Sequence, residues 1–259
     1  MTEYEPEAAM HSFRAVETAA YCPRKLYYRK RSPAEETPEA VTRLRDLASA
    51  YETVLADERA LQSAPIEVTP TQFRTQIGRA RARLTTEEWN ALCTPVARDI
   101  LLTGRECRGR IHKLLHIDTD ASDSTPDAQE RTTLETDEDA FDLSDSERLS
   151  LSLVFAGRPP ETGVWHAQSV RLMAAAKALS WECQTQIKRV FVEYPAYGVI
   201  REIAVDARRT AAYREAVRIA DALDGPPGRT NNRKKCSPCE FQPQCGVRTR
   251  SLRSLLGRS

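Results

Sequence analysis

The sequence has no long apolar run. A membrane-spanning helix needs about 20 consecutive apolar residues, and no such stretch occurs anywhere in the 259 residues. The first ten residues, MTEYEPEAAM, are acidic and have no charged-then-apolar leader. We therefore expect no membrane partner, no signal peptide and a cytoplasmic protein. Hydrophobic residues still make up 41% of the chain, which is enough to form a globular core.

Lysine is scarce as well, with 7 residues against 31 arginines. The net charge of +1 conceals a strong asymmetry, because residues 118–147 contain twelve acidic residues and one basic residue. The remaining 25 acidic and 37 basic residues give the rest of the chain a charge of about +12. A basic body of this size suits a polyanionic partner such as nucleic acid. The alternative is a GC-rich genome that favours arginine codons.

No histidine lies near the three C-terminal cysteines. Cys236, Cys239 and Cys245 form a C-x2-C-x5-C pattern in the run KKCSPCEFQPQCG. Thiolates at this spacing hold zinc or an iron–sulfur cluster, and both groups require four ligands. In a cytoplasmic chain, seven cysteines indicate metal binding or free thiols more than disulfides. The fourth ligand must therefore come from a distant part of the sequence.

Four other cysteines could supply that ligand. Cys93 and Cys183 fall on apolar faces of predicted helices and are typical of small core residues. For Cys107, the sequence does not decide between a ligand and a core residue. Cys22 precedes Pro23 and lies among basic residues that would stabilise a thiolate. Cys22 is the preferred fourth ligand, and the site would then join the two ends of the chain.

The hydrophobic patterns predict one α/β domain with a mixed sheet. Residues 41–116 are predicted to be largely helical, with a capping box at 85–88 and a later helix that carries Gly109 and His112. The acidic stretch 117–147 is predicted to be a flexible insert. The core, 148–225, should contain a strand near 149–154, a buried helix at 168–183, strands at 187–194 and 199–205, and a helix at 207–223. Residues 1–40 contain Cys22, and residues 226–259 contain Cys236, Cys239 and Cys245.

Arg201 is unusual because it shares a strand face with three apolar residues, Val199, Ile203 and Val205. A charge that points inward from a sheet needs a partner or a cleft. Arg201 could contact a ligand in a cleft. Alternatively, this face is solvated at that end of the sheet, or Arg201 forms a structural salt bridge.

These motifs together resemble a known family. The segment YCPRKLYY at 21–28 and the C-x2-C-x5-C pattern are similar to the CRISPR-associated RecB-type exonucleases of the PD-(D/E)XK nuclease superfamily. The resemblance includes Gly109-x-x-His112, similar to a helix motif of that family, and the strand–turn–strand around Arg201. It implies a restriction-endonuclease-like core with a helical N-terminal region and a C-terminal segment that binds a 4Fe–4S cluster through Cys22, Cys236, Cys239 and Cys245. It also implies a setting in CRISPR adaptation and antiviral defence, with adaptation proteins as partners.

The family places a histidine, an aspartate and a Glu-x-Lys pair around Mg²⁺ or Mn²⁺. His112 matches the histidine, but Ser152 or a neighbour stands where the aspartate is expected, and no carboxylate lies between Arg148 and Glu161. Glu161 is the candidate for the Glu-x-Lys position, yet it has no following lysine, and Arg171 replaces a glutamine. We therefore expect an iron–sulfur DNA-binding protein with reduced or lost nuclease activity. An active single-strand exonuclease with His112 and Glu161 as catalytic residues is one alternative, and a zinc-stapled protein-interaction scaffold is another.

Basic residues around the cysteines and the former active site are candidates for contact with DNA ends or single strands. The candidates are Arg24, Lys25, Arg171, Arg201, Lys234 and Lys235.

Overall fold

The computed structural model describes residues 10–33, 37–117, 148–230 and 232–246. The acidic insert predicted at 117–147 lies outside the described residues except for Ile117, as do the arginines after residue 246. Within the described residues, no helix is both long enough and apolar enough to cross a membrane.

The described residues form one mixed six-stranded sheet. Its strands are β1 (His11–Ser12), β2 (Ala97–Thr103), β3 (Cys107–His116), β4 (Leu149–Val154), β5 (Arg189–Tyr194) and β6 (Val199–Ala204). The order is β1-β3-β4-β5-β6, and β2 also pairs with β3. The β4–β5 and β1–β3 pairs are parallel and the others are antiparallel. The predicted α/β class with a mixed sheet is thus confirmed.

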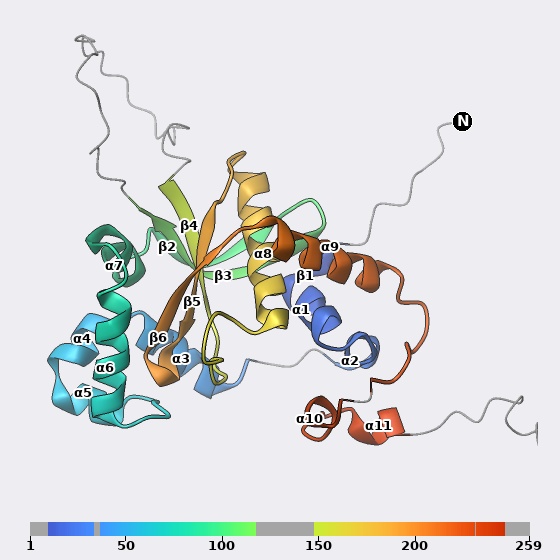
Figure 1. The fold of residues 1–259 in the computed structure, drawn as a ribbon, viewed down its shortest axis with the longest axis horizontal. Coiled ribbons are helices and arrows are strands. Elements are labelled where there is room, and N and C mark those ends of the chain that lie inside the picture. The colour runs from blue at the N-terminus through green and yellow to red at the C-terminus, as the bar shows by residue number, and fades with distance from the viewer. Residues whose placement is uncertain (1–9, 34–36, 118–147, 231, 247–259) are drawn as a thin grey trace, which may run out of the picture.

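Helices cover both faces of this sheet (Figure 1). One layer contains α1 (Phe13–Tyr21), α8 (His166–Glu182) and α9 (Ala207–Asp221). The other contains α3 (Glu39–Ala48), α4 (Tyr51–Ala56), α5 (Glu58–Ser63), α6 (Pro70–Arg81) and α7 (Thr86–Cys93). The short helices α2 (Pro23–Arg29), α10 (Arg233–Cys236) and α11 (Gln242–Gly246) lie beside the α1 layer, and η2 (Pro195–Tyr197) joins β5 to β6.

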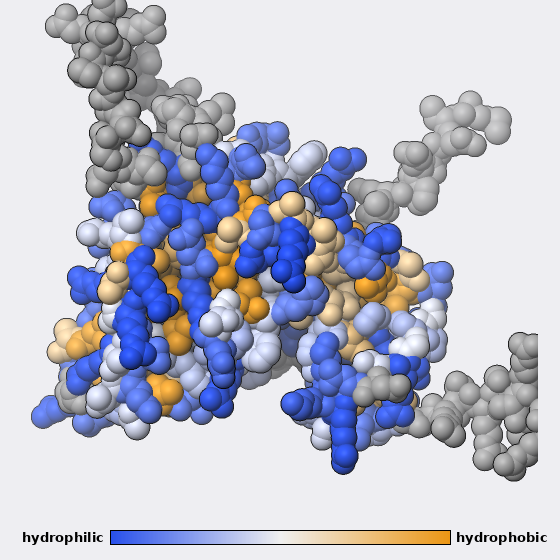
Figure 2. All heavy atoms as spheres, viewed as in Figure 1, coloured by the Kyte–Doolittle hydropathy of each residue, from blue (hydrophilic) through white to orange (hydrophobic). Residues whose placement is uncertain are grey.

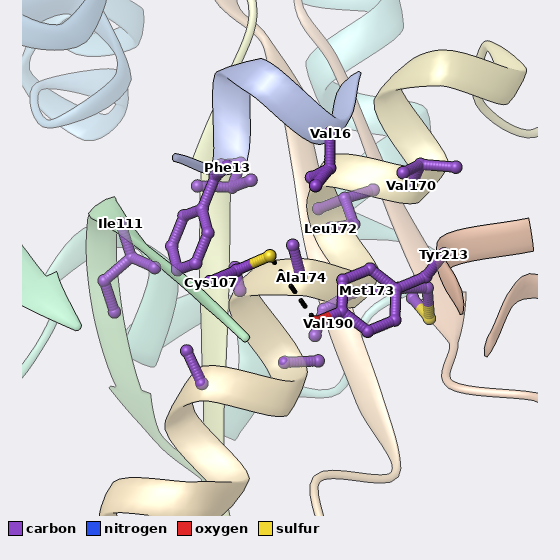
Figure 3. Close-up of a cluster of buried hydrophobic side chains, with 14 of the residues drawn as sticks. Phe13, Val16, Cys107, Ile111, Val170, Leu172, Met173, Ala174, Val190 and Tyr213 are labelled. Carbon is purple, nitrogen blue, oxygen red and sulfur yellow. Dashed lines mark hydrogen bonds between the residues drawn. The ribbon is translucent and has the colours of Figure 1, made fainter. Parts of the chain in front are cut away.

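The alternation along β4 explains why the sheet has two buried faces. Leu149, Leu151 and Leu153 pack into the core against α1, α8 and α9. Figure 3 shows part of this core, which includes Phe13, Val16 and Met173. The intervening serines and the Val154 side chain face the helices α3–α7, where a second core forms. Successive side chains of a strand point to opposite faces, so one strand serves both cores.

Most elements of the predicted core are confirmed. The strand at 149–154, the alanine-rich helix, the strand pair around 195–198 and the final helix lie where the patterns place them. The predicted capping box is present as well: Thr85 and Glu88 cap each other's backbone at the start of α7. Gly198 adopts a left-handed φ of 64° at the end of η2, a conformation that glycine tolerates without strain.

The helical region predicted at 41–116 is wrong beyond residue 96. Residues 97–116 form the β2–β3 hairpin, so Gly109 and His112 lie on a strand and not on a helix. The run CRGRIH at 107–112 alternates less polar and polar residues with period two, and pairing with β2 selects this pattern. Gly109 is needed here for packing, since a Cβ atom would lie 2.5 Å from the ring of Phe13.

Candidate functional site

A cavity of about 430 Å³ opens at the carboxyl end of β4, between α1, α3 and the start of α8. We call it the β4 cavity. Val154, Phe155 and Ala156 form one wall, and His112 lies at its base on β3. Its charged lining is strongly biased toward one sign, because Glu17 is the only carboxylate among the described lining residues. The basic lining residues are Arg14, Lys25, Arg29, Arg45 and Arg171.

His112 is held as a neutral imidazole. The β3–β4 ladder ends at Lys113 and Ser152, and beyond it the Val154 backbone N–H donates to His112 Nδ1 over 2.8 Å. Since Nδ1 accepts this hydrogen bond, the proton of the neutral ring must be on Nε2. Burial, with the charges of Arg171, Arg45 and Lys113, lowers the pKa of His112 to about 3. Near neutral pH, the ring is therefore a hydrogen-bond donor at the base of the cavity.

Arg171 reaches the cavity from α8 and pairs with Glu17 of α1, with 3.3 Å between Nη1 and Oε2. Burial raises the pKa of the Glu17 carboxyl, although the Arg171 guanidinium acts in the opposite direction. Arg45 of α3 has a longer contact, 3.6 Å, with Asp99. The Nε atoms of Arg45 and Arg171 are buried and have no hydrogen-bond partner among the described residues. Unpaired buried donors of this kind favour an acceptor-rich ligand.

The residues of the β4 cavity do not fit a catalytic divalent cation. Mg²⁺ and Mn²⁺ prefer several oxygen ligands, and here the one carboxylate, Glu17, already faces an arginine. His112 cannot coordinate through Nδ1, which accepts a backbone N–H, or through Nε2, which carries the proton. Glu161, the other predicted catalytic residue, does not line this cavity. The predicted pair His112 and Glu161 is therefore not brought together.

A glutamate and a lysine do meet in the sheet, but away from the cavity. Glu193 of β5 accepts from Lys113 Nζ over 2.8 Å and from Ser152 Oγ over 2.5 Å. Lys113 also donates to the carbonyl oxygens of Ala48 and Leu92. The side chains of Glu193, Lys113 and Ser152 are fully buried, so a substrate cannot reach them. The sequence signal for this network was present as charged residues inside apolar strand patterns, RIHKLL and VFVEY.

The four predicted ligand cysteines line one small cavity of about 30 Å³. Cys22 lies between α1 and α2, and the other three lie in the C-terminal segment with α10 and α11. Within the described residues, no group of three or more His, Cys, Asp or Glu side chains is placed to hold a single metal ion as it stands. The donor set nevertheless fits a thiolate-bound group, because four soft sulfur donors surround a common space.

Direct protein contacts also join the α1–α2 region to the C-terminal segment around this cysteine cavity. Lys235 Nζ donates to the Tyr21 carbonyl over 2.9 Å, and Arg24 Nη1 donates to the Pro227 carbonyl over 2.9 Å. The ring of Tyr28 stacks on Phe241. Burial and then the nearby cysteine thiolates raise the pKa of Tyr21. Tyr21 and Lys25 line both this cavity and the β4 cavity, so the two adjoin.

The remaining cysteines are not part of that group. Burial raises the pKa of the Cys93 thiol to about 11, and it raises the pKa of Cys107 to about 11 as well. Figure 3 shows Cys107 inside the core, where the Tyr213 hydroxyl lies 3.5 Å from its sulfur. Burial also raises the pKa of Cys183. These three thiols remain protonated near neutral pH, and thiolate is the form that binds metals.

The other predicted DNA contacts are distributed unevenly. Lys25 and Arg171 line the β4 cavity, whereas Arg24 points to the C-terminal segment and Lys235 to Tyr21. Lys234 is exposed and lines neither cavity. Arg201 occupies a separate cavity with Glu161, where its guanidinium donates to backbone carbonyls. The predicted DNA contacts are therefore divided between separate cavities. Sequence reasoning missed four residues of the β4 cavity, which lie on α1, α2 and α3: Arg14, Glu17, Arg29 and Arg45.

Comparison with known proteins adds no family assignment: no protein-family model matches the chain, and a search of curated proteins gives no significant match.

Proposed function

We propose that this protein binds DNA through the phosphates of its backbone and does not cleave it. The observation that carries the proposal is the charge of the β4 cavity, where five basic side chains surround one carboxylate that is already paired with Arg171. Guanidinium groups recognise phosphate oxygens through parallel N–H donors. The unpartnered Nε atoms of Arg45 and Arg171 and the neutral His112 ring would add donors to the same ligand.

We propose that the protein is a degenerate relative of the CRISPR-associated RecB-type exonucleases. In a metal-dependent nuclease, carboxylates hold the cation that polarises the phosphodiester and activates water. Here Ser152 is buried and donates to Glu193, while Glu161 lies in another cavity. A role in CRISPR adaptation or DNA processing, with adaptation proteins as partners, follows from the resemblance alone.

We further propose a 4Fe–4S cluster on Cys22, Cys236, Cys239 and Cys245. When bound, the cluster would join the chain ends and keep α2 beside the C-terminal segment. Lys25 of α2 lies 3.1 Å from Glu240 and also lines the β4 cavity. The cluster would therefore act on DNA binding by positioning basic residues, and its chemistry there is structural.

The binding site is tested by one neutralising substitution and its matched control. Arg45→Gln removes a cavity guanidinium, whereas Arg43→Gln makes the same charge change at an exposed position of the same helix. We expect the affinity for a labelled single-stranded oligonucleotide to fall with Arg45→Gln and to stay near the wild-type value with Arg43→Gln. Equal affinities for the two variants would contradict this site.

Absence of cleavage is tested with end-labelled single-stranded DNA and Mn²⁺. We expect no product above the protein-free background. Product formation that disappears in both Glu17→Gln and His112→Asn would overturn the proposal and favour an active exonuclease.

The cluster is tested by anaerobic purification and metal analysis. We expect a brown protein with iron and acid-labile sulfide in equal amounts, and loss of both in Cys22→Ser. Cys93→Ser is the control, because Cys93 lies at the end of α7 outside the cysteine cavity, and it should keep the cluster. A colourless protein that contains zinc and no iron would refute the cluster.

A further inference from the structure

A second basic cavity, of about 480 Å³, is formed by α6, by β6 and by the loop that follows β4. We call it the β6 cavity. Arg79, Arg83 and Arg158 line it, and Glu161 is its only carboxylate among the described lining residues. None of these three arginine side chains forms an ion pair or hydrogen bond with another described residue. Figure 2 shows hydrophilic residues gathered over α6, on this side of the molecule.

One loop separates the β6 cavity from the β4 cavity. Ala156 lines the β4 cavity and Arg158 lines the β6 cavity. Two residues of extended chain span at most about 7 Å, so the two basic cavities come close together at this loop. Arg201 fixes the far side of the loop, since its guanidinium donates to the carbonyls of Pro160 over 2.8 Å and of Glu161 over 3.0 Å. It also donates to the Gly163 carbonyl.

An exposed tryptophan lies at the same place. The side chain of Trp165 is half exposed, which is unusual for so large an apolar residue. Its Nε1 donates to the Arg158 carbonyl over 2.8 Å, so the ring has a fixed edge in the loop. Trp165 also immediately precedes α8, two residues before Ala167 of the β4 cavity. Trp165 lines neither cavity itself, but it lies between Arg158 of the β6 cavity and Ala167 of the β4 cavity.

We propose that Trp165 is a stacking platform for an unpaired base, and that a single strand of DNA passes from the β4 cavity across the loop to the β6 cavity. The proposal rests on the DNA binding proposed above and specifies its substrate as single-stranded. Aromatic side chains flanked by basic grooves bind single strands in this way, because every base has a π face while the cations track the backbone. Paired bases in a duplex present no free face to the ring.

The test compares Trp165→Ala with Trp181→Ala, a matched control. Trp181 is equally exposed but lies on the last turn of the same helix, about 24 Å along the axis. We expect Trp165→Ala to weaken binding of a labelled oligothymidylate roughly fivefold or more. Binding of an abasic oligonucleotide of the same length should be unchanged, and Trp181→Ala should match the wild type with both. Trp165→Phe should restore part of the affinity.

A second measurement does not depend on the alanine variant. In Trp181→Phe, the remaining tryptophans are Trp165 and the buried Trp89, so oligothymidylate should quench the fluorescence of Trp165. The abasic strand should quench it much less. Equal affinity of Trp165→Ala and Trp181→Ala for oligothymidylate, or equal losses with the abasic strand, would overturn the stacking role. If the wild type binds neither strand, the proposed DNA binding itself fails, and this distinguishes the two failures.

Discussion

At the scale of single residues, His112 makes folding stability depend on pH. Its pKa in the folded protein is about 3, below the usual histidine value near 6.5. As the pH falls below about 6.5, the unfolded chain therefore binds a proton at this position that the folded chain does not bind. The part of the unfolding free energy that depends on the neutral His112 ring is fully present above about pH 6.5. It decreases by about 1.4 kcal/mol per pH unit as the pH falls toward 3.

His112→Asn should reduce that loss. The asparagine carbonyl can still accept from the Val154 backbone N–H, but the side chain does not titrate. Denaturant unfolding between pH 7 and pH 5 measures the effect, with His166→Asn at an exposed position as the control. A pH dependence unchanged by His112→Asn would contradict the buried neutral imidazole.

The buried Glu193–Lys113 pair gives a second prediction at this scale. Glu193→Gln leaves the Lys113 ammonium buried without a counter-charge, which costs about 3–5 kcal/mol of unfolding free energy. Glu215→Gln removes one partner of the exposed pair with Arg218 and should cost under about 1 kcal/mol. Urea denaturation of the two variants measures the contrast. Similar losses would show that the buried pair contributes no more than a surface pair.

Sequence patterns identify short motifs, but they do not show which distant residues meet in the folded protein. The spacing of Cys236, Cys239 and Cys245 groups these three sulfurs, and Pro23 with the basic neighbours of Cys22 selects the fourth. All four line one cavity. Glu17 and Arg45 carry no motif, and they meet Arg171 only because α1, α3 and α8 pack around the end of β4. The face of Arg201 was predicted, but its carbonyl partners depend on a loop path that no short pattern encodes.

At the scale of elements, Arg201 anchors the loop that separates the two basic cavities. Arg201→Lys keeps the charge but cannot donate to three carbonyls in the same fork geometry. We expect faster amide hydrogen exchange in residues 156–163 and little change elsewhere in the sheet. Arg208→Lys, at an exposed position of α9, is the control. Unchanged exchange in the loop would show that Arg201 does not hold it.

Local pattern predicted the elements after residue 148 and failed for the hairpin at 97–116. The alanine-rich helix and the alternating leucines of β4 are unambiguous because one period dominates each run. In β3, Gly109 and His112 at a spacing of three also suit a helix, and the local sequence does not decide. Pairing with β2 and the approach of Phe13 to Gly109 are long-range effects that select the strand.

At the scale of the whole molecule, the N-terminal helices and the C-terminal segment together place basic side chains at one end of the sheet. α1 and α2 bring basic side chains from the N-terminal end to the β4 cavity, and the C-terminal segment holds α2 through Glu240. The lower right of Figure 1 shows α10 and α11 beside α2, away from the sheet. Mixed α/β class could be predicted from the order of the elements, whereas the positive charge of the cavity emerges only from this assembly.

The salt dependence of single-stranded DNA affinity reports how many phosphates the basic side chains of the β4 cavity neutralise. Each phosphate neutralised by a basic side chain releases counterions, so the logarithm of the binding constant should fall linearly with the logarithm of the salt concentration. We expect a steep slope for the wild type, a slope smaller by roughly one in Arg45→Gln, and the wild-type slope in Arg43→Gln. Affinity without salt dependence, or no binding at low salt, would contradict a phosphate-binding cavity.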